Sequence, residues 1–311
     1  MRSLLARLGL RARSLLKPAV DAVAGALTVL LLKLVRRTDP DRISGFGGRA
    51  MRRLGPWLPE HRTGRANLAA ALPDLTRAEI EDILLGAWEN LGRIGAEFAH
   101  LDRLWDYRED ARESGRVEVP AATMERFRQL RDDGKPALLF SAHLANWELA
   151  AVAAAAHGLD TAILYRRPNI GDVADAIQKI RAVNMGTLIS TGGLDAAFRV
   201  TAALERGAHV GLLVDQHFSR GVDVTFFGRP CKANPMLARL ARRFECPIHG
   251  ARVVRLPGNR FRLEITEEVI PVRDAHRQID VAPTMQTVTA VVERWVREHP
   301  EQWLWQHRRW R

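Results

Sequence analysis

The chain has 311 residues, of which 47% are hydrophobic, and it carries a formal net charge of +11. This length and composition suffice for a full hydrophobic core, in one large domain or two smaller ones. The two cysteines, Cys231 and Cys246, form no CxxC pair, which argues against a disulfide framework or a zinc knuckle and fits a reducing cytoplasm.

Residues 1–37 hold most of the excess positive charge. They contain eight basic residues against one acidic residue, Asp21, and so account for +7 of the net +11. Between Asp21 and Lys33 lies AVAGALTVLLL, whose eleven residues are fewer than the roughly 20 that a spanning helix needs. No small-residue cleavage site follows, so a signal peptide is not indicated. An apolar helix with basic residues at both ends favours the interface of an anionic membrane; the alternative is an ordinary buried helix with a solvated basic arm.

Residues 38–135 have the pattern of a mainly helical region. Thr76 stands three residues before Glu79, the spacing of a capping box, which predicts that a helix begins just after Thr76. Apolar residues then recur with a helical period as far as Phe98.

From residue 136 onward, short apolar runs alternate with helical stretches. The expected strands are 137–143, 161–165, 187–190 and 208–215, and the helices between them are 147–158, 172–184 and 194–207. A last strand pair joined by the turn PGN is expected at 246–256 and 260–269, before an amphipathic helix at 284–300. This alternation predicts an α/β fold with a mostly parallel central sheet flanked by helices. Since no linker interrupts residues 38–311, we expect one domain there, helical over 38–135 and α/β over 136–311.

Three polar residues stand at or just after the ends of three of the expected strands. His143 ends the run ALLFSAH, Arg166 follows TAILY, and Asp215 follows AHVGLLV. In an open α/β sheet, functional residues gather at the carboxyl ends of the strands. We therefore expect these three side chains at one edge of the sheet.

His143 and Glu148 have the chemistry of a general base and its orienting acid. Five residues on a straight helix turn through about 140°, so the two side chains can meet only if His143 lies in the turn before the helix. The carboxylate would then hold one ring N–H while the other nitrogen accepts a proton. No G-x-S-x-G nucleophile motif is present, so the proton would come from a substrate hydroxyl, which would take an acyl group directly from a thioester. The alternative is a chance spacing, and a metal site is not indicated because no second histidine stands at ligand spacing.

Several blocks of the sequence resemble the bacterial lipid A biosynthesis acyltransferases, the lauroyl and myristoyl transferases of the lysophospholipid acyltransferase superfamily. HLANWE, residues 143–148, is similar to the family's H-x-x-N-W-E signature. YRRPN, DQHF, VTFFGRP and the final WLWQHRRWR follow in the family's order. The resemblance extends from about residue 15 to the end of the chain, and it implies a glycerol-phosphate-acyltransferase-like fold.

The resemblance also implies a role for each polar residue of these blocks. His143 would be the general base and Glu148 its catalytic partner. Asp215 would order Arg166, which would bind phosphate or stabilise developing negative charge. The substrate-binding candidates are Arg166, Arg181, Asp215 and Asn146; for Asn146 the alternative is a cap on the helix that carries Glu148.

Two departures from the family pattern bear on these roles. Ala145 stands where the family often has glycine, which would crowd the turn slightly. The doubled Arg166–Arg167 offers two arginines for the family's Tyr-Arg block, and motif register favours Arg166.

The function that the resemblance implies is O-acyl transfer in lipid A and lipopolysaccharide biosynthesis. The donor would be acyl carrier protein or acyl-CoA, and the acceptor a hydroxyl of a phosphorylated lipid A precursor or related glycolipid. The reaction would need no cofactor and no metal, and it would take place on an anionic membrane surface, at the cytoplasmic face of the bacterial inner membrane.

Three alternatives stay open. The acceptor could be another glycolipid or hydroxylated lipid, or the chain could be a lipid-binding homologue without catalysis. Nucleic-acid binding would also suit the positive charge, but the basic cluster is interleaved with Leu, Val and Ala instead of stacking aromatic residues, and no helix-turn-helix or RNP pattern is present. We therefore expect no nucleic-acid partner.

Overall fold

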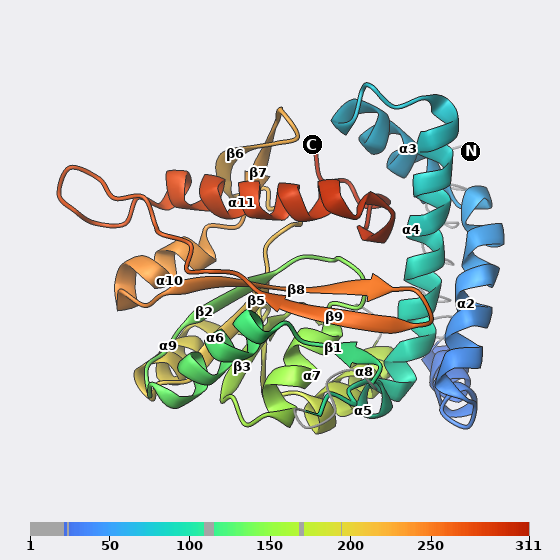
Figure 1. Ribbon diagram of the computed structural model, residues 1–311, viewed down its shortest axis with the longest axis horizontal. Helices are drawn as coiled ribbons and strands as arrows, with labels where there is room; N and C mark the ends of the chain where they lie inside the picture. The colour runs from blue at the N-terminus through green and yellow to red at the C-terminus, as the bar shows by residue number, and fades with distance from the viewer. Residues whose placement is uncertain (1–21, 24, 109–114, 168–170, 194, 311) are drawn as a thin grey trace, which may run out of the picture.

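A seven-stranded sheet forms the centre of the computed structural model, which describes residues 22–23, 25–108, 115–167, 171–193 and 195–310 (Figure 1). Its strand order is β1-β9-β8-β2-β5-β3-β4. All neighbouring strands are parallel except β8 and β9, which form an antiparallel pair. The strands are β1 (Val117–Glu118), β2 (Leu138–Ser141), β3 (Thr161–Tyr165), β4 (Thr187–Ser190), β5 (His209–Leu213), β8 (Ile248–Leu256) and β9 (Arg260–Ile265).

Helices cover both faces of this sheet, as Figure 1 shows for α7 and α8 on one side and α10 and α11 on the other. The first face carries α6 (Ala121–Asp132), α7 (Glu148–Ala156) and α8 (Gly171–Asn184), and the second carries α9 (Ala196–Glu205), α10 (Met236–Phe244) and α11 (Val281–Glu298). On the second face, the ring of Phe140 in β2 stacks on Trp295 of α11 at 5.5 Å between centroids. The predicted fold class, a mostly parallel sheet flanked by helices after a helical N-terminal region, is confirmed.

The helices before β4 and the helices after it lie on opposite faces of the sheet, because at β4 the chain reverses its direction across the sheet. The path from β2 through β3 to β4 moves toward one edge, and the path from β4 to β5 moves back toward the centre. Since parallel crossovers are right-handed, α7 and α8 must lie on one face and α9 on the other. The reversal places the carboxyl ends of β2 and β5 side by side.

A helical region packs beside the sheet (Figure 1). It contains α2 (Pro40–Leu54), η1 (Gly55–Trp57), α3 (Pro59–Ala71), α4 (Arg77–Glu97), η2 (Phe98–His100) and α5 (Leu101–Leu104). The predicted capping box at the start of α4 is confirmed, with hydrogen bonds in both directions between Thr76 and Glu79. Helices α2 and α4 approach closely because both carry glycine at the contact: a Cβ on Gly47 would lie only 2.6 Å from the carbonyl oxygen of Gly92.

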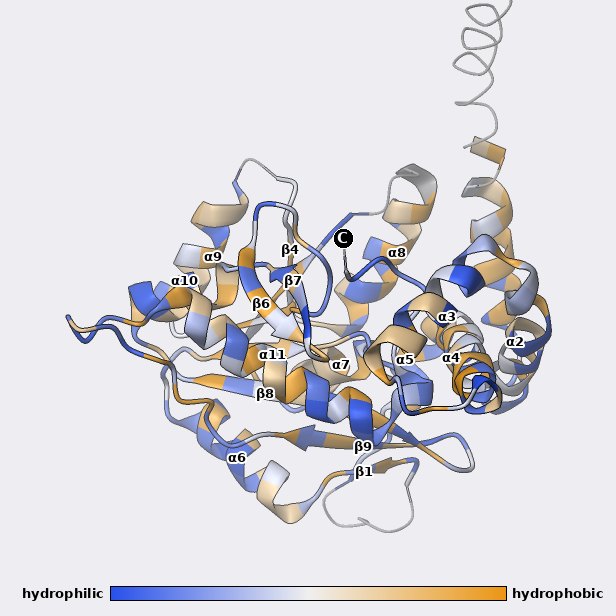
Figure 2. Ribbon diagram, turned by 90° about the horizontal axis from the view of Figure 1, so that it is seen from above, coloured by the Kyte–Doolittle hydropathy of each residue, from blue (hydrophilic) through white to orange (hydrophobic). Residues whose placement is uncertain are grey.

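Residues 25–35 are helical, in agreement with the expected N-terminal helix, of which residues 1–21 and 24 lie outside the described residues. Apolar side chains of this segment, among them Leu27 and Leu31 at 60% exposure each, face away from the core. Figure 2 shows this largely hydrophobic helix at the edge of the molecule, next to α2. In the part of the chain that the structure describes, no helix is long and apolar enough to cross a membrane.

A hairpin that the sequence did not predict, β6 (Val222–Phe226) and β7 (Arg229–Ala233), lies against α11. Its tip packs on the C-terminal segment, where Phe226 and Trp303 contact edge to face at 5.6 Å between centroids. After η4 (Pro300–Gln302), this segment runs back under the loop that follows β2. Its side chains Trp303, Trp305 and Arg309 are buried, so the end of the chain belongs to the core.

Candidate active site

The register of β2 and β5 brings His143 and Asp215 together. These parallel neighbours pair Ser141 with Leu213 at their carboxyl ends. His143 and Asp215 each come two residues after that pair, so they leave the sheet at the same point. The prediction that these two residues share one edge of the sheet is confirmed.

The two side chains form a hydrogen-bonded pair. Nδ1 of His143 lies 2.8 Å from Oδ1 of Asp215, and the backbone N–H of His143 donates to Oδ2 at 2.8 Å. The other ring nitrogen, Nε2, lies 3.2 Å from the amide nitrogen of Gln216, an exposed residue. With Nδ1–H donating to the carboxylate, a neutral imidazole has its lone pair on Nε2, where the Gln216 N–H can donate. That is the form in which histidine accepts a proton.

Asp215 is held as a carboxylate although its side chain is completely buried. Burial acts to raise the pKa of Asp215, but the positive charge that His143 carries when protonated, together with the hydrogen bonds from His143, outweighs it and brings that pKa below its usual range. The indole N–H of Trp303 donates to Oδ2 at 2.8 Å and adds a third donor. A buried carboxylate with this many donors can stabilise the imidazolium that forms when His143 takes up a proton.

The loop between β2 and α7 has a strained turn at Ala145, whose φ of 46° lies in the left-handed region. This backbone conformation suits glycine, which is the residue that the resemblance leads one to expect there. Ala145 donates its N–H to the carbonyl of Gln302 at 2.9 Å, so the C-terminal segment holds the turn. Two residues later, the ring of Trp147 contacts the imidazole of His143 edge to face at 4.8 Å between centroids.

The prediction that Glu148 forms a hydrogen bond with His143 is wrong. Glu148 is buried at the start of α7, and Arg181 of α8 holds both its oxygens, through Nε at 3.0 Å and through a second bond from its terminal nitrogen. Trp147 donates to the same carboxylate at 3.2 Å. Asp215 takes the expected place of Glu148 because α7 begins at Glu148 and directs it toward α8, away from β5. Arg181, one of the predicted substrate-binding residues, is engaged in this ion pair. Its guanidinium also lies over the rings of Phe98 and Tyr165.

The alternative role of Asn146, a cap on α7, is not found, because no side chain caps this helix. The Asn146 side chain is completely buried and donates to Glu97 at 2.9 Å. Glu97 in turn binds Arg255 through both oxygens, at 2.6 and 2.8 Å. Burial acts to raise the pKa of Glu97, but the charge and hydrogen bonds of Arg255 outweigh it and keep that pKa low. Asn146 therefore ties the site loop to a buried ion pair, and this burial gives no support to substrate contact.

Arg166 lies at the expected edge of the sheet but apart from Asp215. It directly follows β3, and its side chain is exposed. The prediction that Asp215 orders Arg166 is wrong. Both oxygens of Asp215 accept hydrogen bonds from His143 or Trp303 instead. The neighbouring Arg167 is engaged by Asp175 at 2.5 Å. Both arginines are exposed, and among the described residues Arg166 is the one of the two that forms no ion pair.

A comparison with known protein families shows to which family the chain belongs. The family model described as bacterial lipid A biosynthesis acyltransferase matches residues 11–311, essentially the whole chain. The chain belongs to this family. A search of curated proteins gave no significant match.

The site of this acyltransferase contains two polar residues that sequence reasoning did not select. Gln216 directly follows Asp215, and its place at a strand end was a usable signal. Trp303 stands first in the final WLWQHRRWR block, but its role could not be predicted from there, because it reaches Asp215 from 88 residues away through the fold. Within the described ranges, no group of three or more His, Cys, Asp or Glu residues is arranged to hold a metal ion.

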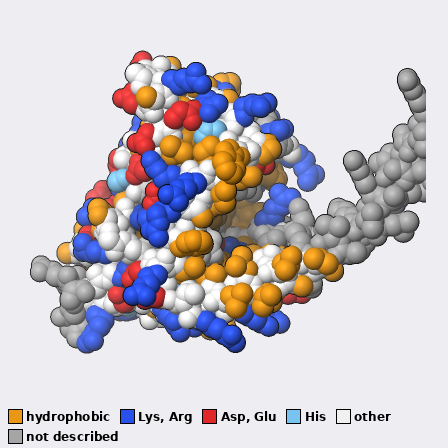
Figure 3. Space-filling model, turned by 90° about the vertical axis from the view of Figure 1, so that its right-hand side faces the viewer, with side chains coloured by type: hydrophobic (Ala, Val, Ile, Leu, Met, Phe, Trp, Pro, Cys, Tyr) orange, Lys and Arg blue, Asp and Glu red, His pale blue; other side chains and the backbone are white. Residues whose placement is uncertain are grey.

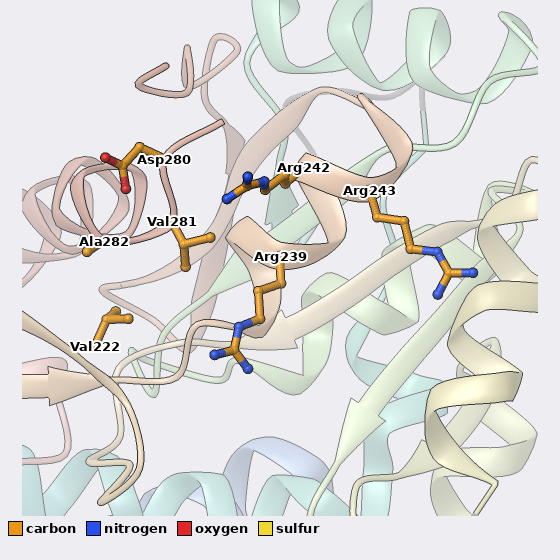
Figure 4. A pocket seen from close by; sticks show the side chains of 7 residues that line it. All are labelled: Val222, Arg239, Arg242, Arg243, Asp280, Val281 and Ala282. Atoms are coloured by element: carbon orange, nitrogen blue, oxygen red, sulfur yellow. The ribbon is translucent and has the colours of Figure 1, made fainter. Parts of the chain in front are cut away.

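An open hollow of about 680 Å³ lies elsewhere on the acyltransferase, between α10 and the start of α11. Its lining residues are Val222, Arg239, Arg242, Arg243, Asp280, Val281 and Ala282. Figure 4 shows Arg242 extending toward Val281, while Arg243 extends away on the other side of the helix. The arginines do not converge on one point, and none of the residues of the His143 site lines this hollow.

Proposed function

We propose that the protein moves a fatty acyl chain from a thioester to a hydroxyl of a lipid A precursor, with His143 as general base and Asp215 as its partner. The observation that carries this proposal is the imidazole of His143, whose Nδ1 is held by a buried carboxylate while Nε2 lies beside the exposed Gln216. Membership of the family supplies the reaction class. Glu148 acts here as a structural partner of Arg181 instead of as the orienting acid.

The transfer proceeds without a covalent enzyme intermediate. The acceptor hydroxyl takes the place of the Gln216 amide at Nε2 of His143 and gives up its proton there as its oxygen attacks the thioester carbonyl. The tetrahedral adduct then expels the thiolate, the C–S bond breaks, and the imidazolium returns its proton to the sulfur. The products are an ester and a free thiol, and Asp215 stabilises the imidazolium between the two steps.

The donor in this proposal is acyl carrier protein or acyl-CoA, and the acceptor is a phosphorylated glycolipid. Arg166 is the arginine that fits the acceptor phosphate best, because it is exposed at the edge of the sheet where His143 lies. Arginine can grip a phosphate through two parallel hydrogen bonds. Arg181 is committed to Glu148 and contributes to the site by holding α7 against α8.

We place the protein at the cytoplasmic face of the bacterial inner membrane, with residues 1–37 as the interface segment and 38–311 as one acyltransferase domain. Two exposed apolar groups support this location: the side chains of helix 25–35, and Trp57 of η1, which is 80% exposed. Figure 3 shows hydrophobic side chains gathered on this side of the molecule, with lysines and arginines around them. Such a combination favours an anionic bilayer surface.

The direct test uses the purified full-length protein in mixed micelles, with acyl-acyl carrier protein or acyl-CoA as donor and a lipid A precursor as acceptor. We expect acceptor-dependent release of thiol and, by mass spectrometry, one added acyl chain. His143→Ala abolishes both, whereas His276→Ala, which changes an exposed histidine in the turn before α11, leaves both unchanged.

Two other results would each assign a different function to the protein. Transfer to a different hydroxylated lipid, with the lipid A precursor inert, assigns another acceptor to the same chemistry. Tight lipid binding without thioester consumption for any acceptor makes the chain a lipid-binding homologue. Mass analysis of lipid A from cells with and without the protein checks the first of these in its natural setting.

A further inference from the structure

We propose that Trp303 is a positioning residue for the His143–Asp215 pair, and that the C-terminal segment thereby forms part of the active site. This inference rests on the proposed function. Its starting observation is the hydrogen bond from the Trp303 indole N–H to Oδ2 of Asp215, at 2.8 Å. The indole is 1% exposed and the Asp215 carboxylate is fully buried, so water cannot replace this donor.

The donors on Asp215 divide between its two oxygens in a way that fixes the carboxylate plane. Oδ1 receives Nδ1–H of His143, and Oδ2 receives the backbone N–H of His143 together with the Trp303 indole. Both bonds from His143 reach the carboxylate from one residue. The indole is the donor that comes from a different segment, and it keeps the carboxylate from rotating away from the imidazole.

The same C-terminal segment also holds the loop that carries His143. Leu144 and Trp303 form an antiparallel bridge, and the carbonyl of Gln302 accepts from Ala145 at 2.9 Å. Asn90 of α4 donates to that carbonyl as well, at 3.0 Å. The loop on one side of the pair and the carboxylate on the other are therefore both fixed by residues 302–303.

Further contacts keep this segment in place. Asn67 of α3 donates to the carbonyls of Trp305 and His307, at 2.9 and 2.8 Å. The buried Arg309 donates to the carbonyl of Lys232 in β7 at 2.7 Å. These hydrogen bonds fix the segment to the helical region and to the hairpin. The position of the segment relative to Asp215 therefore depends on contacts with both parts of the fold.

An uncharged donor on Oδ2 also tunes the protonation of the pair. His307 and Arg309 of the same segment act on Asp215 electrostatically as well, and both are unchanged in a variant at position 303. It draws negative charge away from the oxygens that face the imidazole, and so it disfavours the imidazolium relative to the neutral base. Removing it strengthens the hold of Asp215 on the protonated ring. A larger fraction of the enzyme is then protonated, and inactive as a base, at a given acidic pH.

The test compares Trp303→Phe with Trp88→Phe in the full-length protein. Both indoles are buried in the same cluster and each donates one hydrogen bond, but Trp88 of α4 donates to Nδ1 of His61, away from Asp215. For Trp303→Phe we expect kcat to fall about tenfold, the size that loss of one hydrogen bond to a charged group predicts, with KM for the thioester unchanged. The acid limb of its pH–rate profile moves to higher pH. Trp88→Phe keeps the kcat and the acid limb of the wild type.

Equal kcat and acid limbs for the two variants would overturn the inference and reduce Trp303 to a packing residue. If Trp303→Phe does not fold, 3-benzothienylalanine at position 303 replaces only the N–H by sulfur in a ring of the same shape, and the same two readouts decide. A wild type that transfers no acyl chain would contradict the proposed function instead, so the two failures are distinguishable.

Discussion

The carboxylate that binds the imidazole of His143 belongs to Asp215, 72 residues further along the chain, and its Oδ1 lies 2.8 Å from Nδ1 of His143. The nearer acid, Glu148, is part of the same short signature but is bound by Arg181. The base and its partner therefore come from adjacent parallel strands, and their relative position depends on the register of the sheet. This arrangement gives the two acids different expected phenotypes.

Asp215→Asn should cost far more activity than Glu148→Gln. An amide at 215 cannot stabilise the imidazolium and can hold the ring in the wrong tautomer, so we expect kcat to fall about 10³–10⁴-fold, as in other His–Asp pairs. Glu148→Gln leaves the pair intact, and we expect a loss of about tenfold or less through the weakened contact with Arg181. Initial rates of acceptor-dependent thiol release measure both. A larger loss for Glu148→Gln would restore Glu148 as the orienting acid.

Glu148 and Arg181 should be coupled in stability. Glu148→Leu alone leaves the Arg181 guanidinium, whose side chain is 18% exposed, without its carboxylate, and we expect a loss of about 2–3 kcal/mol in the free energy of unfolding. Glu148→Leu combined with Arg181→Met removes both charges and should recover most of that loss. Urea unfolding of the four proteins of the cycle gives the coupling energy. Additive single effects would mean that the ion pair contributes nothing.

Acid should weaken the fold through Glu97. The pKa of Glu97 is lowered in the folded protein by Arg255, whereas an unfolded glutamate has a pKa of about 4.3. Below that value the unfolded chain binds the proton more readily, so this contribution is fully present at neutral pH and is lost as the pH falls toward the folded pKa.

Glu97→Gln supplies the matched measurement. At pH 7 the variant should be less stable by about 3–5 kcal/mol, because Arg255 stays buried without a counter-charge. As the pH falls below about 4, the wild type loses the contribution that the variant already lacks, and the difference narrows. Urea unfolding at pH 7, 4.5 and 3.5 tests this, and a difference that stays constant with pH would argue against it.

Membrane binding should depend on helix 25–35. Leu27→Ser together with Leu31→Ser removes two exposed leucines, and we expect at least about a tenfold loss of partitioning into anionic vesicles. Val183→Ser together with Phe198→Ser changes two apolar residues on α8 and α9 that are even more exposed, and serves as the control. Sedimentation with vesicles measures both. Equal losses in the two double variants would point to general surface hydrophobicity.

Local sequence patterns determined the elements of this protein and the edge at which its site lies. The strands at 161–165 and 187–190 and the capping box at Thr76 agree with the structure residue by residue, because strand length, turn residues and caps act over a few positions. The strand-end rule likewise placed His143 and Asp215 at one edge. The hairpin of β6 and β7 was missed, since its short strands acquire their burial only from α11 and the C-terminal segment.

Only the tertiary structure decided which side chains meet at that edge. The direction in which α7 leaves the loop places Glu148 beside Arg181. The register of β2 and β5 places Asp215 beside His143. The C-terminal segment then returns to the sheet and brings Trp303 to Asp215. These choices depend on contacts between residues 33 to 88 positions apart. A spacing along the chain limits which side chains can meet, but the packing of strands and helices around the core selects the partner.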